Sequence, residues 1–124
     1  MHCCWGLENR EAALTFCAAT AGNPRGAHLE VKPIDPSANP HLSSTAILGA
    51  ALAGIRARSP LLTEVRVNPA KLSDADAHAA QLALLPTSPT EMLRMLASSS
   101  LATEIYGEQS DEATTERLRF VWSA

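Results

Sequence analysis

The sequence is poor in aromatic residues, in cysteine and in net charge of either sign. Aromatic side chains make up 4% of the 124 residues, and much of the 46% that is hydrophobic is alanine, which buries little area per residue. A chain of this length has room for one domain that buries about two thirds of its unfolded surface. The alanine content favours helices over strands.

Charge and apolar patterning exclude several classes of partner. Ten basic and 13 acidic side chains give a net charge of -3. This slight excess of acid gives no sign of a basic surface that would bind nucleic acid or anionic lipid. No apolar run approaches the roughly twenty residues that span a bilayer, and the polar start MHCCWGLENRE lacks the pattern of a signal peptide. The three cysteines form no spaced disulfide framework and fit reduced thiols. We therefore expect a cytoplasmic protein with no membrane or nucleic-acid partner.

Extended segments are predicted in the first third of the chain. The stretch from Trp5 to Thr20 is interpreted as a strand, centred on residues 12–17, because apolar and small or polar residues alternate there. The Gly/Pro/Asn cluster at 21–26 predicts a turn. Beyond it, His28 to Ile34 alternates as a strand does, which places Glu30 and Lys32 on the same face.

Helices are predicted for most of the remainder. The clearest spans 39–57, where Asn39 can cap the first turn, Pro40 suits its start and Pro60 prevents its continuation. Its apolar residues recur at helical spacing and predict one stripe, formed by Leu42, Ile47, Leu48, Ala51, Leu52 and Ile55. The further predicted helices are a short one capped by Ser73 and running to Leu85, then 91–97, 101–106 and 110–122.

Glu30, Lys32 and Asp35 offer carboxylates and an amine near the end of a strand that enters a proline-rich turn. Hard cations such as Mg²⁺ and Mn²⁺ prefer oxygen ligands on stiff supports, so a metal site is one interpretation. The other is a solvated strand face with an exposed ion pair worth less than about 1 kcal/mol. Spacing alone favours the solvated face.

Other polar residues give weaker signals. Arg10 and Arg25 could contact phosphate or carboxylate oxygens, although surface arginines are common and no Walker pattern is present. A zinc site built from His28, His41 and the cysteines 3, 4 and 17 would lack any familiar ligand spacing. Capping at the start of the short helix that follows Ser73 accounts for the two acids Asp74 and Asp76.

Two stretches, WGLENREAALTFC and HLEVKPIDPSANPHLSSTAILGAALAGI, resemble the carboxyl-terminal part of the glutamine synthetase catalytic domain. In that family an Asn-Arg pair opens one strand, a Glu-Val-Arg or Glu-Val-Lys strand follows, and Asp-x-x-Ala-Asn-Pro-Tyr-Leu begins a helix that ends in Leu-Asp-Gly-Ile. The corresponding residues here are Asn9-Arg10, Glu30-Val31-Lys32, the segment 35–42 and Leu52-Ala53-Gly54-Ile55, in the same order and at similar spacing. Lys32 and the sequence Glu-Asn-Arg-Glu-Ala at 8–12 look closer to the glutamine synthetase-like and gamma-glutamyl-amine ligase branch than to the housekeeping enzyme.

The resemblance implies an α+β fold with about two antiparallel strands followed by a mainly helical half. It also implies that residues 1–124 are the C-terminal portion of such a catalytic domain, without the N-terminal domain and most of the catalytic domain. The activity implied is that of an ATP-dependent ligase, in which the side-chain carboxylate of glutamate is phosphorylated and ammonia or an amine then displaces the phosphate. Mg²⁺ or Mn²⁺ would be the cofactor and ATP the co-substrate.

Site residues follow from the resemblance position by position. Glu30 would be a metal ligand, and Arg10 would be a catalytic residue that contacts phosphate and the glutamate substrate. Lys32 would stand where the family usually has an arginine that holds this substrate, and Arg25 in the place of a basic residue that contacts ATP. The chain departs from the family at Thr15, where the pattern has a second arginine, and at His41 and Ala53.

Three hypotheses about function remain open at this stage. The first is a ligase fragment that is inactive alone, because one metal carboxylate and one or two cations do not preorganise phosphoryl transfer; an upstream-encoded half would complete it. The alternative is a non-catalytic interaction module that docks on full-length synthetase subunits. The third is a stand-alone metal-binding protein built on Glu30 and the histidines.

Overall fold

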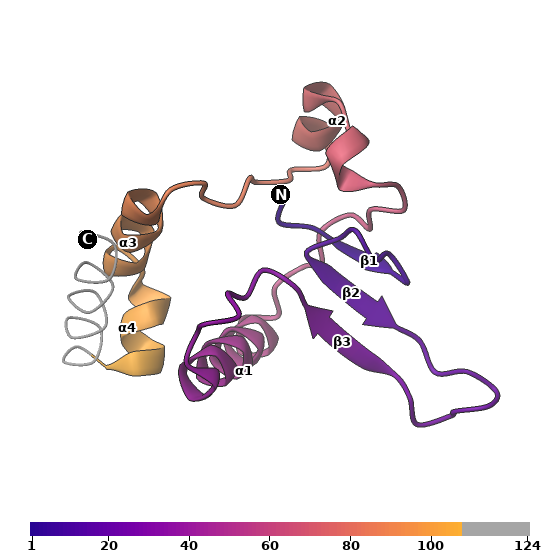
Figure 1. The fold of residues 1–124 in the computed structure, drawn as a ribbon, viewed down its shortest axis with the longest axis horizontal. Helices are drawn as coiled ribbons and strands as arrows, with labels where there is room; N and C mark the ends of the chain where they lie inside the picture. Colours follow the sequence, from indigo (N-terminus) through magenta and orange to yellow (C-terminus); the bar gives the residue numbers. More distant parts are fainter. Residues whose placement is uncertain (108–124) are drawn as a thin grey trace. The chain divides into compact units, whose positions relative to one another are not determined.

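The computed structural model describes residues 1–107 and divides the chain into two units (Figure 1). The first unit comprises Met1–Pro36 and Pro60–Leu85, and the second comprises Ser37–Ser59 and the chain from Pro86 onward. Each unit is therefore assembled from two separate segments of the sequence.

The first unit contains a three-stranded sheet in the order β1-β2-β3 (Figure 1). These strands are β1 (Trp5–Leu7), β2 (Leu14–Cys17) and β3 (His28–Val31). Strands β2 and β3 are antiparallel, as predicted, and the turn between them lies in the Gly/Pro/Asn cluster. Strand β1 pairs in parallel with β2, so the sheet is mixed. The α+β class is confirmed, with one more strand than the pattern indicated.

The segment that was predicted as one strand, Trp5 to Thr20, is two strands joined by a tight loop. Glu8 leaves β1 with a φ of 52°, a left-handed conformation that ends the extended chain. Ala12 and Ala13 then turn inward and are 0% and 3% exposed. Parallel neighbours usually need a crossover of a dozen or more residues. Here residues 8–13 connect the two strands, and the buried residues of this short connection are the small Ala12 and Ala13.

The core of the first unit is small and contains no aromatic side chain. Cys4, Ala12, Val65 and Leu82 form its buried cluster, with Leu72 and Ala80 packed against it. Residue 65 reaches the sheet through a backbone hydrogen bond in which its N–H donates to the Trp5 carbonyl at 2.9 Å. The buried Cys4 is a free thiol that behaves as an apolar side chain.

Helix α1 (Pro40–Ala57) is the main element of the second unit and agrees closely with the predicted 39–57. The Asn39 side chain accepts hydrogen bonds from the backbone N–H groups of His41 and Leu42, and Arg58 ends the helix in the left-handed region. No residue of α1 is fully buried, and Leu48 and Ile55 are 70% and 74% exposed. The predicted apolar stripe therefore exists in sequence but is largely uncovered.

Helix α1 packs against another helix of its unit at a glycine, Gly49. Helix α4 (Ser100–Tyr106) lies against it, and a Cβ placed on Gly49 would come within 2.7 Å of the Ile105 side chain. The Tyr106 hydroxyl donates a hydrogen bond to the Leu42 carbonyl at 3.0 Å, near the start of α1. Glycine at position 49 thus allows the two helices to approach closely.

Three shorter helical elements complete the described chain. They are the 3-10 helix η1 (Pro69–Lys71), α2 (Asp74–Ala79) and α3 (Pro89–Ala97). Helix α2 has the predicted cap at Ser73 but ends earlier than Leu85, because Gln81 takes a positive φ of 56°. The helix predicted at 110–122 lies outside the described residues. Within the described part of the chain, every helix is too short or too polar to cross a membrane.

Candidate functional site

One face of the β2–β3 ribbon carries the polar side chains of the candidate site. In the antiparallel register Thr15 pairs with Glu30, and Cys17 pairs with His28. Since side chains alternate across a strand, all four project to the same side, while Phe16 and its partner Leu29 project to the other. The β2–β3 register and the alternation of side chains together bring a hydroxyl, a thiol, an imidazole and a carboxylate to one face.

This polar face borders a hollow of about 390 Å³ in the first unit. The hollow is formed by the β1–β2 loop, the polar face and the β2–β3 turn. Its lining residues are Glu8, Arg10, Thr15, Cys17, Ala18, Thr20, Asn23, Gly26, His28 and Glu30. Two of the four sequence-predicted site residues, Arg10 and Glu30, therefore line the same space.

Glu30 lies between two cationic or titratable neighbours. Its Oε1 is 3.6 Å from the Nε2 of His28, and its Oε2 is 3.6 Å from the Nζ of Lys32. The pKa of His28 is raised, first by the hydrogen bond between its ring and the Gly26 carbonyl and then by the Glu30 carboxylate. The Glu30 side chain is 46% exposed, so its ion pair with Lys32 contributes less than about 1 kcal/mol. The carboxylate remains accessible to a ligand from the hollow.

Lys32 ties the end of β3 to the β1–β2 loop. Its ammonium group donates hydrogen bonds to the Arg10 carbonyl at 2.8 Å and to the hydroxyl of Thr15. Thr15 is 1% exposed and in turn donates to the Asn9 carbonyl at 2.7 Å. The predicted shared face of Glu30 and Lys32 is confirmed by their ion pair, and Thr15 serves as an anchor for the lysine.

Asn9 fixes the backbone from which Arg10 projects. Its side-chain amide donates to the carbonyls of Val65 and Val67, at 2.6 and 3.0 Å, and its Oδ1 accepts from the Glu11 N–H at 3.1 Å. Sequence reasoning noted the Asn-Arg pair but assigned no role to the asparagine. The signal available in the sequence was the residue type itself, because an asparagine side chain readily forms hydrogen bonds to backbone groups in turns and loops.

The remaining candidate residues lie elsewhere. Among the described residues that line the hollow, Arg25 is absent; it is exposed in the β2–β3 turn. His41 belongs to the second unit, and Cys4 is buried in the core. Ser73 caps α2 by accepting from the Asp76 N–H at 3.1 Å, and its hydroxyl donates to the Asp76 carboxylate at 2.6 Å, so the acid is part of the cap.

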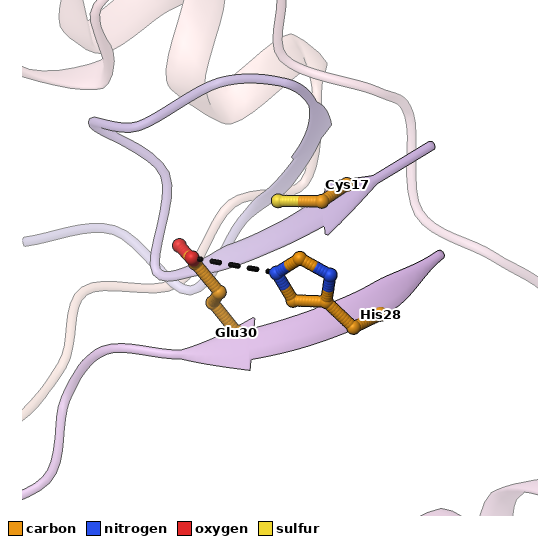
Figure 2. Close-up of side chains that lie close together, drawn as sticks. All are labelled: Cys17, His28 and Glu30. Carbon is orange, nitrogen blue, oxygen red and sulfur yellow. Dashed lines mark ion pairs between the residues drawn. The ribbon is translucent and has the colours of Figure 1, made fainter. Parts of the chain in front are cut away.

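Cys17, in contrast, belongs to the polar face. Burial raises the pKa of its thiol, and the carboxylates of Glu30 and Glu8 raise it further. Its sulfur, an imidazole nitrogen of His28 and a carboxylate oxygen of Glu30 all lie within 4.8 Å of one another (Figure 2). The sequence spacing gave little indication of this cluster, because its members come from two strands.

Comparison with known proteins agrees with this arrangement of motifs. Residues 1–114 match the family described as glutamine synthetase, catalytic domain. The chain is 39% identical over 104 residues to Gamma-glutamylpolyamine synthetase GlnA3 of Streptomyces coelicolor, which covers 83% of this chain and 22% of that protein. It is 32% identical over 127 residues to the glutamine synthetase of Archaeoglobus fulgidus, covering 99% of this chain and 25% of that protein. The glutamine synthetase of Sulfolobus acidocaldarius is 35% identical over 96 residues, which are 77% of this chain and 20% of the relative.

The mixed α+β fold and the order of the motifs agree with part of a glutamine synthetase-type catalytic domain. The chain belongs to the glutamine synthetase catalytic domain family. It spans about a quarter or less of the length of these relatives.

Proposed function

We propose that this chain contributes part of the active site of an ATP-dependent ligase that joins the side-chain carboxylate of glutamate to ammonia or an amine. The observation that carries the proposal is the shared hollow, which combines the Glu30 carboxylate with Arg10 in a member of the glutamine synthetase family. Because the chain spans about a quarter or less of its relatives, we assign it one portion of the site. The resemblance of its motifs makes this the C-terminal portion. The other groups would come from another segment or chain.

The donors around the hollow fit a hard divalent cation. Mg²⁺ keeps several waters and binds proteins through one or two carboxylates, and both Glu8 and Glu30 line the space. Glu8 is held in place by accepting a hydrogen bond from the Ala18 N–H at 2.7 Å. When bound, Mg²⁺ or Mn²⁺ would neutralise phosphate oxygens during phosphoryl transfer. Glu30 would be its principal ligand.

The cationic residues would hold the anionic reactants. Arg10 projects from a loop fixed by Asn9 and can donate several hydrogen bonds to phosphate or to the glutamate carboxylate. Lys32, with its Nζ held near Glu30, would neutralise a substrate carboxylate as a point charge. Arg25 in the exposed turn would contact the nucleotide. Such preorganised charges favour the transition state because they need no reorientation during the reaction.

The choice between ammonia and an amine rests on sequence alone. The chain is 39% identical to a protein named for the gamma-glutamylation of polyamines, and Lys32 stands where housekeeping enzymes usually have arginine. We favour an amine as acceptor on this basis. Formation of gamma-glutamyl product from ammonia and from a diamine, compared in the assembled enzyme, tests this choice.

Metal and nucleotide binding test the proposed role of Glu30. Mn²⁺ is titrated into the purified chain with ATP present and followed by electron paramagnetic resonance. We expect binding that Glu30→Gln weakens by about tenfold or more, since even loss of an outer-shell partner of a metal ligand costs roughly that much. The matched control is Glu104→Gln, an exposed acid of α4. Equal binding by wild type and Glu30→Gln would refute the assignment.

A ligase assay tests the contribution to catalysis. The chain alone should form no gamma-glutamyl hydroxamate from glutamate, ATP and hydroxylamine. Mixed with a full-length family subunit that is inactivated at the glutamate aligned with Glu30, the wild-type chain should restore product and Glu30→Gln should not. Failure of the wild-type chain to restore any product in a demonstrated complex would count against a catalytic contribution.

The uncovered face of α1 favours a second candidate function, a module that docks on full-length synthetase subunits. Leu48, Leu52 and Ile55 share one side of this helix and are 70%, 45% and 74% exposed. Serine substitution of all three should abolish co-elution with such a subunit in size-exclusion chromatography. Leu61→Ser, at an apolar position of the first unit that is 84% exposed, is the control and should not.

A further inference from the structure

The side chains of Cys17, His28 and Glu30 meet above the β2–β3 ribbon. Figure 2 shows the sulfur, the imidazole and the carboxylate on the same side of the two strands, with an ion pair between the histidine and the glutamate. Cys17 and His28 are direct partners in the antiparallel ladder, and Glu30 follows two residues along the same face. The ligand atoms lie within 4.8 Å of one another, a spacing that a single ion between them can bridge after small side-chain adjustments.

A second observation concerns the orientation of the imidazole. The Nδ1 of His28 is 2.7 Å from the Gly26 carbonyl oxygen, which can only accept, so Nδ1 carries the proton. The other nitrogen, Nε2, therefore presents its lone pair toward the cluster in the neutral ring. Metal-binding histidines are typically fixed in this way, with one ring N–H donated to a carbonyl or carboxylate and the other nitrogen free for the metal.

The β2–β3 turn holds the Gly26 carbonyl in place. The backbone of Gly26 donates to the Asn23 carbonyl at 3.0 Å, and Asn23 and Thr20 exchange two backbone hydrogen bonds of 3.0 and 3.2 Å. A Cβ on Gly26 would come within 2.3 Å of the Asn23 side chain, so glycine is needed for this close packing. The acceptor that orients His28 is thus part of the hydrogen-bonded turn.

We propose that Cys17, His28 and Glu30 form a three-ligand site for Zn²⁺, with the fourth coordination position open to the hollow. Thiolate and imidazole are ligands that zinc prefers and that Mg²⁺ does not. Three protein ligands and one open position are the arrangement of zinc sites that bind water or a substrate. On binding, the S–H bond of Cys17 breaks, a Zn–S bond forms and one proton passes to the solvent.

The local charges support a cation at this place. Glu8 and Glu30 both line the hollow beside Cys17, so two carboxylates border the proposed site. A divalent ion there would compensate their negative charge. The ion pair of Lys32 is with Oε2 of Glu30, whereas Oε1 lies 3.6 Å from the Nε2 of His28, on the side of the proposed metal.

This zinc site goes beyond the proposed ligase function and does not depend on it. It rests on Cys17 and His28, neither of which has a role in the phosphoryl-transfer chemistry assigned above. Glu30 belongs to both sites, so Zn²⁺ bound here would compete with Mg²⁺ or Mn²⁺ for that carboxylate.

Cobalt spectroscopy tests the site, because Co²⁺ is a coloured substitute for Zn²⁺ and its thiolate complexes show a near-ultraviolet charge-transfer band. The reduced, metal-free chain is titrated with Co²⁺, and Zn²⁺ is then added to displace it. We expect one ion per chain, the thiolate band, and displacement by Zn²⁺ but not by a large excess of Mg²⁺. Absence of the thiolate band in the wild type would overturn the proposal.

Matched variants identify the ligands. Cys17→Ser should abolish the band, and Cys17→Ser and His28→Gln should each weaken Zn²⁺ binding by at least the roughly 10- to 100-fold that loss of an outer-shell partner of a metal ligand costs. Cys3→Ser and His41→Gln are the controls and should bind as the wild type does. A band that persists in Cys17→Ser, or that disappears in Cys3→Ser, would refute the assignment. Far-UV circular dichroism verifies that each variant keeps its fold, as expected for His28, whose side chain is 57% exposed.

The same variants separate the two metal proposals. Cys17→Ser should lose the cobalt signal and keep the Mn²⁺ response, whereas Glu30→Gln should diminish both. Cobalt binding without any Mn²⁺ response would contradict the ligase assignment of Glu30 but not the zinc site. Mn²⁺ binding without the cobalt signal would contradict the zinc site but not the ligase assignment.

Discussion

Replacing Asn9 by alanine should destabilise the first unit more than is usual for a residue in a partly exposed loop. The substitution removes three hydrogen bonds, two donated to the carbonyls of Val65 and Val67 and one accepted from the Glu11 N–H. Each is worth about 0.5–1.5 kcal/mol net, so the free energy of unfolding should fall by about 1.5–4.5 kcal/mol. A domain of this size loses about 1–3 kcal/mol per molar urea, so the urea midpoint should drop by roughly 0.5 M or more.

Urea unfolding followed by the fluorescence of Trp5, in a Trp122→Phe background, measures this change. Trp5 is suited to the purpose because its indole N–H donates to the Leu62 carbonyl at 2.8 Å within the same unit. Arg10→Ala is the control, since the Arg10 side chain is exposed, and it should keep the midpoint. Asn9→Asp should be at least as unstable as Asn9→Ala at neutral pH, because its carboxylate would face two carbonyl oxygens. Stability equal to wild type in Asn9→Asp would refute the reasoning.

Three further predictions concern other contacts. Gly6→Ala should lower the free energy of unfolding by about 1–3 kcal/mol, because its Cβ would lie 2.5 Å from the Val65 carbonyl oxygen; an unchanged urea midpoint would contradict this. The hydrogen bond from Arg66 lowers the pKa of Glu64, so its contribution to stability should be present above the usual glutamate pKa and be lost as pH falls through the lowered value. Urea midpoints measured against pH should show a smaller acid loss in Glu64→Gln, and identical profiles would argue against it. Asn39→Ala should cost α1 about 1 kcal/mol, whereas Asn39→Asp should retain the cap, as thermal unfolding by circular dichroism would report.

Much of the local structure could be predicted because its causes are local. Asn39 followed by Pro40 determines where α1 begins, and Ser73 determines the start of α2. Both caps satisfy backbone N–H groups within a few residues of themselves, so sequence spacing contains the needed information. The alternation in β3 likewise predicted that Glu30 and Lys32 share a face.

The errors lie where distant segments decide the conformation. The segment from Trp5 to Thr20 was predicted as one strand. However, the Asn9 side chain donates hydrogen bonds to two carbonyls more than fifty positions further along the chain, and these bonds stabilise a loop around Asn9. The end of α2 was placed too late because Gln81 adopts a left-handed conformation that its residue type does not indicate. The apolar stripe of α1 was correctly spaced, yet its exposure depends on what packs against it.

The sequence by itself determined the family, the order of the motifs and the chemical identity of the site residues. Glu30, Arg10 and Lys32 were recognisable because the motif spacing is a property of the chain. Only the tertiary structure decided that Arg10 shares a hollow with Glu30, and that Cys17 faces His28 across two strands. The physical reason is strand register: hydrogen bonds between β2 and β3 bring together side chains that are eleven residues apart in sequence, and no local pattern encodes that pairing.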